Sequence, residues 1–318
     1  MGVILDKSDA KIDLVYLWVD SSNPKWQEKK RLYENNAKDC NKDAVSDCRF
    51  IDNEELKYSL RSVEKNIPWI NKIYIVTDNQ VPAWLDTNNP KIEIVNHTDI
   101  IPNDKLPLYN SCAIETRIPF IKDLSELFIY ANDDMLFWQP IEPEFFFEDN
   151  KPVYIAGKRI LNKKYKHLYG YTINRAYKLI KTRYGVDIPF FPHHNADPYC
   201  KSLFLECENE FKDEFEKTLT HRFRDFSDIQ RTIIMYYSIA QNKAVLKQNK
   251  QSFKDFVLHK PKNSLAYDSK PQNIRKIKHA NSKLLCVNDS RKTTDASRKA
   301  LKKILDEKFP NKSVFEKE

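Results

Sequence analysis

Two adjacent carboxylates follow a strongly apolar segment near the middle of the sequence. Residues 127–131 (LFIYA) run directly into Asn132, Asp133 and Asp134. Carboxylate oxygens are the ligands that Mg²⁺ prefers, and Mg²⁺ usually takes only one or two of them from a protein while substrate phosphates supply others. Adjacent side chains diverge, so one carboxylate can hold the metal while the other orients a water or an arginine. The motif predicts a cation site for a phosphate-bearing ligand, with a helix cap or turn as the competing interpretation.

Two adjacent histidines lie in a proline-flanked loop. Residues 192–197 read PHHNAD, with His193 and His194 side by side. A neutral histidine near pH 7 can take a proton from an attacking hydroxyl, so one of the two is a candidate general base. A structural histidine is the competing interpretation.

A basic cluster stands before an apolar helical segment. Residues 221–228 read HRFRDFSD, and Arg222 and Arg224 point the same way if this segment is extended. The planar guanidinium group offers paired donors to phosphate oxygens. Surface ion pairs with Asp225 or Asp228 would use the same residues.

Composition narrows the class of protein. The chain has 318 residues but only 4 glycines, and it contains neither of the glycine-rich phosphate-binding motifs, so a nucleotide would be held by carboxylates, a metal and basic side chains. The net charge of +8 suits phosphate-rich substrates. No basic helix with base-reading residues and no aromatic RNA-binding strand motif is present, so we expect no nucleic-acid partner.

The cysteines and the hydropathy pattern point to a cytoplasmic protein. None of the 6 cysteines forms a C-x-x-C pair, so reduced thiols are expected rather than a zinc site or a disulfide framework. No apolar run approaches 18 residues and no signal peptide is present. The basic stretch 291–303 is compatible with peripheral contact at a membrane surface, or with a solvated helix.

The candidate residues need elements to position them, and the apolar pattern supplies a sheet. Buried strands are predicted at 12–19 and 72–77, and further strands at 92–95 and 127–131. Helices are predicted at 25–36, 82–85, 171–184, 228–240 and 294–309. A further helix is predicted to begin at a cap formed by Asp52 or Asn53 and to end at Pro68. Alternation of strand and helix predicts a doubly wound α/β protein whose polar residues gather at the carboxyl ends of the strands. From about Phe145 the pattern becomes more helical.

Taken together, the motifs resemble the Stealth family, which includes bacterial capsule polymerases and an animal N-acetylglucosamine-1-phosphotransferase. Four blocks match in order. The first block is IDLVYLWVD at 12–20. The second is long and includes RF at 49–50, DNEELKYSLRSVE at 52–64, PWI at 68–70, IVTD at 75–78, AIE at 113–115 and NDD at 132–134. The third contains His194 and residues 221–230, and the fourth is CVND at 286–289. The blocks span nearly the whole chain.

The chain departs from the family pattern at three points. Ser21 stands where a glycine usually follows the first block, and Thr116-Arg117 replaces the Ser-His pair that often follows Glu115. Ala196 stands where a proline usually follows the histidine of the third block. Because of this last change the choice between His193 and His194 stays open, although counting from Gly185 favours His194.

The resemblance implies a GT-A-like fold with a mostly parallel sheet and a helical second half. It implies a single catalytic domain over residues 1–318, with a nucleotide-sugar-binding core at 12–145, a helical insert at 146–290 and a helical tail at 291–318. It implies catalytic roles for His194, Glu115, Asp134 and Arg224, and metal ligation by Asp133, Asp134 and Asp289. Asp13 and Asp20 are expected to contact the nucleotide because of their positions on and after the first strand. Further substrate contacts are expected from Arg49, Asn53, Arg61, Arg175, Arg222 and Asn288.

The activity that the resemblance implies is transfer of a sugar-1-phosphate. The donor would be a UDP-sugar, the transferred group hexose-1-phosphate or N-acetylhexosamine-1-phosphate, the leaving group UMP, and the cofactor Mg²⁺ or Mn²⁺. The acceptor would be an oligosaccharide or polysaccharide, at the inner face of the bacterial inner membrane during capsule synthesis. The alternative is an ordinary GT-A glycosyltransferase, which would use the same Asn-Asp-Asp motif and release UDP.

Overall fold

The structure, a computed structural model, describes residues 10–34, 50–159, 168–249, 255 and 257–318. Its strands are β1 (Ile12–Leu17), β2 (Ile73–Thr77), β3 (Ile92–Asn96), β4 (Leu127–Asn132), β5 (Met135–Phe137), β6 (Phe147–Glu148), β7 (Lys151–Arg159), β8 (Phe190–Pro192), β9 (Asp197–Cys200), β10 (Val245–Gln248), β11 (Lys262–Asp268) and β12 (Ser282–Asn288). Its α-helices are α1 (Pro24–Glu34), α2 (Glu55–Asn66), α3 (His97–Ile100), α4 (Ser111–Glu115), α5 (Leu168–Tyr184), α6 (Lys201–Glu210), α7 (Lys212–Leu219), α8 (Thr232–Ala240), α10 (Pro271–Lys278) and α11 (Asp295–Lys308).

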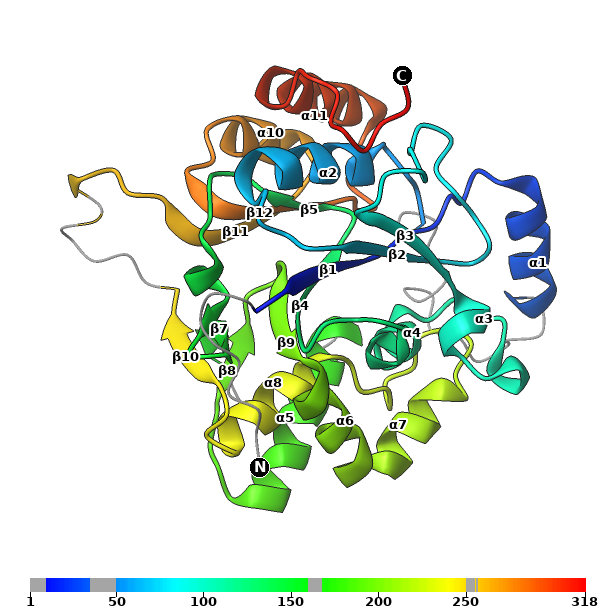
Figure 1. Ribbon diagram of the computed structural model, residues 1–318, viewed down its shortest axis with the longest axis vertical. Helices are drawn as coiled ribbons and strands as arrows, with labels where there is room; N and C mark the ends of the chain where they lie inside the picture. The colour runs from blue at the N-terminus through cyan, green and yellow to red at the C-terminus, as the bar shows by residue number, and fades with distance from the viewer. Residues whose placement is uncertain (1–9, 35–49, 160–167, 250–254, 256) are drawn as a thin grey trace.

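The central sheet has five strands in the order β3-β2-β1-β4-β9 (Figure 1). The first four strands in this order are parallel, and β9 runs antiparallel to β4. The register places Leu17 at the end of β1 opposite Asn132 at the end of β4. Parallel strands present their carboxyl ends at one edge, so the loops that follow β1, β2, β3 and β4 meet there. The predicted α/β class with a mostly parallel sheet is confirmed.

Helices cover both faces of this sheet, as a doubly wound fold requires (Figure 1). Alternate residues of β1 enter different cores: Leu14 and Tyr16 pack with apolar residues of α2, whereas Val15 packs with those of α5 and α8. Successive side chains of a strand point to opposite faces, so a continuous apolar run is what a strand covered on both sides needs. The apolar sequence IDLVYL of β1 therefore follows directly from its central position.

Two smaller sheets bring the second half of the chain to the same edge. In the sheet β11-β12-β5, β12 pairs antiparallel with β5, and β5 begins at the residue directly after Asp134. The backbone N–H of Val287 donates to the carbonyl of Asp134 at 3.0 Å, so Asn288 and Asp289 come to lie beside the end of β4. In the other sheet β8 pairs with β7, and the chain passes from β8 to β9 through the two histidines.

Several local predictions need correction. Residues 82–85 form a turn with an isolated bridge between Leu85 and Glu316, not a helix. Neither Asp52 nor Asn53 caps α2: its N-cap residue is Glu54, in the left-handed region at φ 66°, with no side-chain cap bond. The helix predicted from Asp228 begins only at Thr232. The Asp228 carboxylate instead accepts from the side chain of Asn110 before α4, and from His221 and the backbone N–H of Asp225 in its own loop. These bonds hold the segment before Thr232 in a loop.

The second half of the chain is helical only in part. It contains α5–α8, α10 and α11, but also β7–β12, and β9 belongs to the central sheet. The predicted division at residues 145 and 290 stays a prediction. In the part of the chain that the structure describes, no helix is both long and apolar enough to cross a membrane.

Candidate active site

A pocket of about 830 Å³ opens at the carboxyl edge of the central sheet. All four parallel strands contribute to its wall, through Val19 after β1, Asp78 after β2, His97 after β3 and Asn132 in β4. Ligands of open α/β sheets bind at this edge, and small-molecule sites typically measure about 300–1,000 Å³. The pocket therefore has the place and the size of a site for a ligand of nucleotide size.

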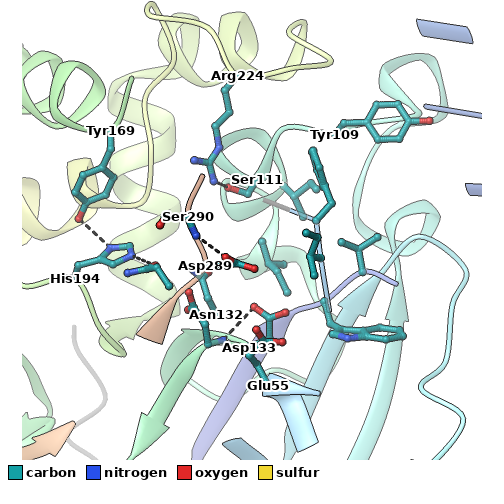
Figure 2. A pocket seen from close by; sticks show the side chains of 18 of the residues that line it. Glu55, Tyr109, Ser111, Asn132, Asp133, Tyr169, His194, Arg224, Asp289 and Ser290 are labelled. Carbon is teal, nitrogen blue, oxygen red and sulfur yellow. Dashed lines mark hydrogen bonds between the residues drawn. The ribbon is translucent and has the colours of Figure 1, made fainter. Parts of the chain in front are cut away.

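Half-buried and buried carboxylates gather on one side of the pocket (Figure 2). Asp133 and Asp134 follow β4, and Glu55 comes from the first turn of α2. Burial raises the pKa of Asp133 well above its ordinary value, and the nearby Asp134, Glu55 and Asp52 raise it further. Burial also raises the pKa of Asp134 to about 6 and that of Glu55 to about 7. Their ionised forms are therefore unfavourable without a counter-charge, and a bound cation would stabilise them.

The chemistry of these donors fits a hard divalent cation. Among the residues that the structure describes, no group of three or more His, Cys, Asp or Glu side chains forms a metal cage. Mg²⁺ does not need one, because it keeps waters and substrate oxygens as ligands. Asp133 and Asp134 fit this pattern. Asp289 lines the same pocket, but its carboxylate already accepts from Arg298 at 3.0 Å and from the backbone N–H of Ser290 at 2.6 Å.

His194 lies in the pocket wall between two partners from distant parts of the chain (Figure 2). Its Nδ1 is 3.2 Å from the hydroxyl of Tyr169 in α5, and its Nε2 is 3.2 Å from the amide oxygen of Asn288 in β12. An amide oxygen can only accept, so Nε2 carries the proton and Nδ1 is the nitrogen that accepts, here from the hydroxyl of Tyr169. Burial, with smaller contributions from Arg231 and other cations, lowers the pKa of His194 to about 4. The ring is therefore neutral at pH 7.

The neighbouring histidine is turned away. The hydroxyl of Ser264 lies 2.6 Å from Nδ1 of His193, and His193 is absent from the wall of the main pocket. Of the two histidines left open by the sequence, only His194 reaches the carboxylate-lined pocket.

Arg224 reaches the pocket from the loop before α8 and is held there by α4. Its Nη2 donates to the hydroxyl of Ser111, the first residue of α4, and both residues line the pocket. The Ser111 hydroxyl in turn lies 3.4 Å from Oε1 of Glu115, one helical turn along α4. The guanidinium is thus connected, through one hydroxyl, to a buried carboxylate.

Glu115 lies behind the pocket wall, where only 3% of the residue is exposed. The hydroxyl of Tyr130 is 3.3 Å from its Oε1, and Nη1 of Arg231 is 3.6 Å from its Oε2. Arg231 is itself buried and also contacts Asp197 at 3.3 Å. Glu115 is therefore placed to orient pocket residues, and its own carboxylate does not reach the pocket surface.

The structure places three predicted substrate-binding residues outside this pocket. Asp13 is near the amino end of β1, at the opposite edge of the sheet, where its carboxylate accepts from Asn71 and from the backbone of Ser125, each at 2.7 Å. Arg61 forms an ion pair with Glu316 at 2.7 Å. Arg175 pairs with Glu214 between α5 and α7. Each side chain holds structural elements together, and none lines the pocket.

Asn53, Arg222 and Asp20 lie next to residues of the pocket wall without lining the pocket themselves. Asn53 donates to Glu55 at 2.7 Å, and Arg222 donates to the carbonyl of Pro107 at 2.8 Å while lying over the ring of Tyr33. Asp20 is at the correct edge of the sheet, but its carboxylate accepts from the backbone and hydroxyl of Ser22 within a turn. Arg49 lies outside the described residues.

Sequence reasoning missed four residues that shape the site. Glu55 could have been found, since it stands in the DNEE segment that opens a helix. Tyr169, Ser111 and Arg231 carry no local signal, because only tertiary packing brings them to His194, Arg224 and Glu115.

Comparison with known families gives three matches along the chain. Residues 10–38 match Stealth protein CR1, conserved region 1; residues 49–154 match Stealth protein CR2, conserved region 2; and residues 193–240 match Stealth protein CR3, conserved region 3. These regions include β1, the carboxylates after β4, His194 and Arg224.

Curated relatives match over most of the chain. The capsular polysaccharide phosphotransferase SacB of Neisseria meningitidis serogroup A is 32% identical over 96% of this chain, which spans only 57% of that protein. The capsular polysaccharide phosphotransferase WcwK of Streptococcus pneumoniae is 30% identical over 96% of this chain and 99% of its own length. The receptor polysaccharide phosphotransferase WefC of Streptococcus gordonii is 31% identical with the same coverage.

Among solved structures, the galactosyltransferase LgtC in complex with donor and acceptor sugar analogs is similar over 95% of this chain and 97% of its own. The identity is 10% and the TM-score 0.45. At this TM-score the likeness says nothing about donor or acceptor.

Proposed function

The chain belongs to the Stealth protein family, and on this premise we propose that it transfers a sugar-1-phosphate from a nucleotide sugar to a carbohydrate hydroxyl in capsular polysaccharide synthesis. The donor in this proposal is a UDP-linked hexose or N-acetylhexosamine. One observation carries the proposal: in a chain whose relatives are named polysaccharide phosphotransferases, a single pocket combines a carboxylate pair, a guanidinium and a neutral histidine.

In the proposed reaction, an acceptor hydroxyl attacks the β-phosphorus of the donor. A new bond forms between the acceptor oxygen and phosphorus, and the bond between that phosphorus and the bridging oxygen breaks. UMP leaves with the electron pair, and the product is a phosphodiester. Such a transfer needs the reactants held in line and the charge on the phosphoryl oxygens balanced.

The residues of the pocket can divide these tasks. His194 is neutral, and its Nδ1 accepts the proton of the attacking hydroxyl, on the side where Tyr169 now donates. Arg224, held by Ser111, offers paired donors to phosphoryl oxygens. Asn288 fixes the ring of His194 from its other nitrogen.

A divalent cation would be held by Asp133 and Asp134, with Asp289 at the border of the site, and would supply positive charge to the diphosphate. The chain positions these carboxylates through the β4–β5 turn and the pairing of β5 with β12.

Analysis of the nucleotide product tests this function. The protein is incubated with a panel of UDP-sugars, Mg²⁺ and capsule-type oligosaccharide acceptors. UMP together with a phosphorus-containing linkage in the product is the expected result. Release of UDP without a phosphodiester would overturn the proposal in favour of ordinary glycosyl transfer. The predicted cytoplasmic location, and contact with the inner membrane, stay predictions.

The role of His194 has a matched control next to it. His194→Ala is expected to lower turnover by about 10²–10⁴-fold while the protein stays folded, because a positioned general base is lost. His193→Ala is expected to keep turnover within a few-fold, since this ring faces Ser264 outside the pocket. Equal losses in the two variants would remove His194 from the mechanism.

A further inference from the structure

Nearly all of the net positive charge of the chain lies in one segment. Residues 268–308 contain 12 lysines and arginines and only 5 acidic residues, a net charge of +7, whereas the whole chain carries +8. This segment contains α10, β12 and α11, and it contributes residues to the wall of the pocket. The rest of the chain is therefore close to neutral, and the excess charge belongs to one side of the fold.

The two helices of this segment begin beside the pocket and run away from it side by side (Figure 1). Asn273, in the first turn of α10, lines the pocket, and Arg298, in the first turn of α11, donates to the pocket residue Asp289 at 3.0 Å. At the other ends of the helices, Lys278 pairs with Glu307 at 3.4 Å. The two helices therefore form one surface that starts at the pocket wall.

The pocket reaches solvent at the loops that lead into these helices. Asp268, at the end of β11, and Arg291, in the loop after β12, both line the pocket. Arg291 is exposed, and the side chain of Asp268 is 46% exposed. Residues that line a pocket and are also exposed form its rim, so a ligand that leaves the pocket here passes onto α10 and α11.

The outer face of the two helices is basic. Arg275 and Lys276 of α10 and Lys299 and Lys303 of α11 are exposed, while the opposite sides of the helices pack into a shared apolar core. Lys299 and Lys303 are four residues apart and so project from the same side of α11. Among the residues that the structure describes, none of these four cations forms an ion pair. Their charges are therefore open to an anionic partner.

The proposed reaction makes an anion of matching chemistry. Each transfer creates a phosphodiester, which carries one negative charge at neutral pH, so a chain built by repeated transfers is a polyanion. In that reaction the end of the acceptor lies in the pocket beside His194, and the rest of the chain leaves over the rim. Exposed cations that start at the rim attract such a chain and hold it near the pocket.

We propose that the outer face of α10 and α11 binds the phosphodiesters of the acceptor chain while the end of that chain lies in the pocket. This inference rests on the proposed function, because it takes the acceptor to be a chain joined by the phosphodiesters that this reaction forms. The continuity with the pocket rim favours this partner over an anionic membrane, which needs a basic face but no path into the pocket.

Affinity for two N-acetylglucosamine oligomers of equal length tests the inference, one joined by phosphodiesters and the other by ordinary glycosidic bonds. The double variant Arg275→Gln/Lys276→Gln should weaken binding of the phosphodiester oligomer by about two- to tenfold, because it removes two exposed charge contacts. Binding of the neutral oligomer should not change. Added salt should weaken binding of the phosphodiester oligomer more steeply in the wild type than in the variant.

The matched control removes the same amount of charge from another surface. Lys178 of α5 and Lys212 of α7 are exposed and lie on the side of the molecule away from α10 (Figure 1). Lys178→Gln/Lys212→Gln should keep the wild-type affinity for the phosphodiester oligomer. Equal weakening in the two double variants would reduce the effect to net charge and overturn the inference, and so would equal affinity of the wild type for the two oligomers.

Two further measurements separate the remaining outcomes. If the α10 variant loses binding only to vesicles of phosphatidylcholine with phosphatidylglycerol, the face is a membrane surface and the inference is wrong. In kinetics with a UDP-sugar donor, the α10 variant should raise KM for the phosphodiester acceptor and leave kcat and the KM for the donor unchanged. UMP release with an unchanged acceptor KM overturns only the inference, whereas a wild type that releases no UMP with any UDP-sugar overturns the proposed function.

Discussion

The carboxylate of Glu115 and the guanidinium of Arg231 form an ion pair at 3.6 Å, with both side chains 4% exposed. Arg231 lies between two acidic groups, since Asp197 is 3.3 Å from its other terminal nitrogen. The ring of Tyr130 packs against the guanidinium at 4.7 Å. This pair lies directly behind the pocket wall and joins β4, β9, α4 and the start of α8.

Removing the buried cation should destabilise the protein strongly. Arg231→Met would leave Glu115 and Asp197 buried without their counter-charge, and we expect a loss of about 3–5 kcal/mol in the free energy of unfolding, measured by denaturant titration. Arg175→Met is the matched control. It breaks a partly exposed pair with Glu214 and should cost at most about 1 kcal/mol. Comparable losses in the two variants would contradict the buried-network interpretation.

The hydroxyl of Ser111 links Glu115 to Arg224. Removing this hydroxyl should lower the rate of the reaction more than the free energy of unfolding. In Ser111→Ala the guanidinium loses its acceptor, and kcat/KM should fall by about 10–100-fold, as for loss of a hydrogen bond to a charged group. Ser111→Thr keeps a hydroxyl and should recover most of the loss. Steady-state kinetics on folded protein measures both. A Ser111→Ala enzyme with wild-type kinetics would show that Arg224 needs no such support.

The pocket carboxylates should make the protein less stable at high pH in the absence of metal. The pKa of Asp134 is raised to about 6 in the folded state from 3.8. The folded protein therefore binds more protons than the unfolded chain between these values, and stability falls as pH rises through this window. At pH 8 Asp134→Asn should be more stable than wild type, by the order of 1–3 kcal/mol.

Two conditions check this prediction. The gain in Asp134→Asn should shrink as the pH is lowered toward 4, where the wild-type carboxyl is also neutral. Saturating Mg²⁺ at pH 8 should stabilise the wild type and not the variant. A variant less stable than wild type in metal-free buffer at pH 8 would contradict the assigned direction of the pKa.

Activity should decline on the acid side because of the same carboxylates. Protonation of Glu55, with a pKa of about 7, and Asp134, with a pKa of about 6, removes negative charge from the proposed cation site as pH falls. The pKa of His194 is about 4, so its ring stays neutral over this range and does not contribute. The acid limb of kcat/KM should therefore lie near pH 6–7 at low Mg²⁺. Higher Mg²⁺ should move it to lower pH, and an acid limb independent of Mg²⁺ would count against the site.

The sequence by itself determined the central sheet and the residues at its edge. Continuous apolar runs predicted β1, β2 and β4, because a strand that is covered on both faces needs apolar side chains on both. The sequence IEIVN of β3, which lies at the edge of the sheet, is only partly buried. Polar residues that follow such strands must meet at one edge, so the pocket positions of Asp133 and Asp134 followed from chain order alone. The secondary structure of short segments that depend on distant contacts was predicted less well. Residues 82–85 form a turn instead of the predicted helix, and Leu85 forms a bridge with Glu316, more than two hundred residues away in the sequence.

Only the tertiary structure decided which polar side chains line the pocket and which hold structural elements together. Asp13 lies within β1 and accepts from Asn71 and Ser125 at the far edge of the sheet, whereas Asp133 directly follows β4 and lies in the pocket. His193 and His194 are adjacent in sequence and face different surroundings. The chain bends at His194, where the backbone N–H of Asn195 donates to the carbonyl of His193, and the partners of the two rings come from segments that no local pattern identifies. Long-range packing, which brings α4, α5 and β12 to one edge of the sheet, therefore selected the residues of the site.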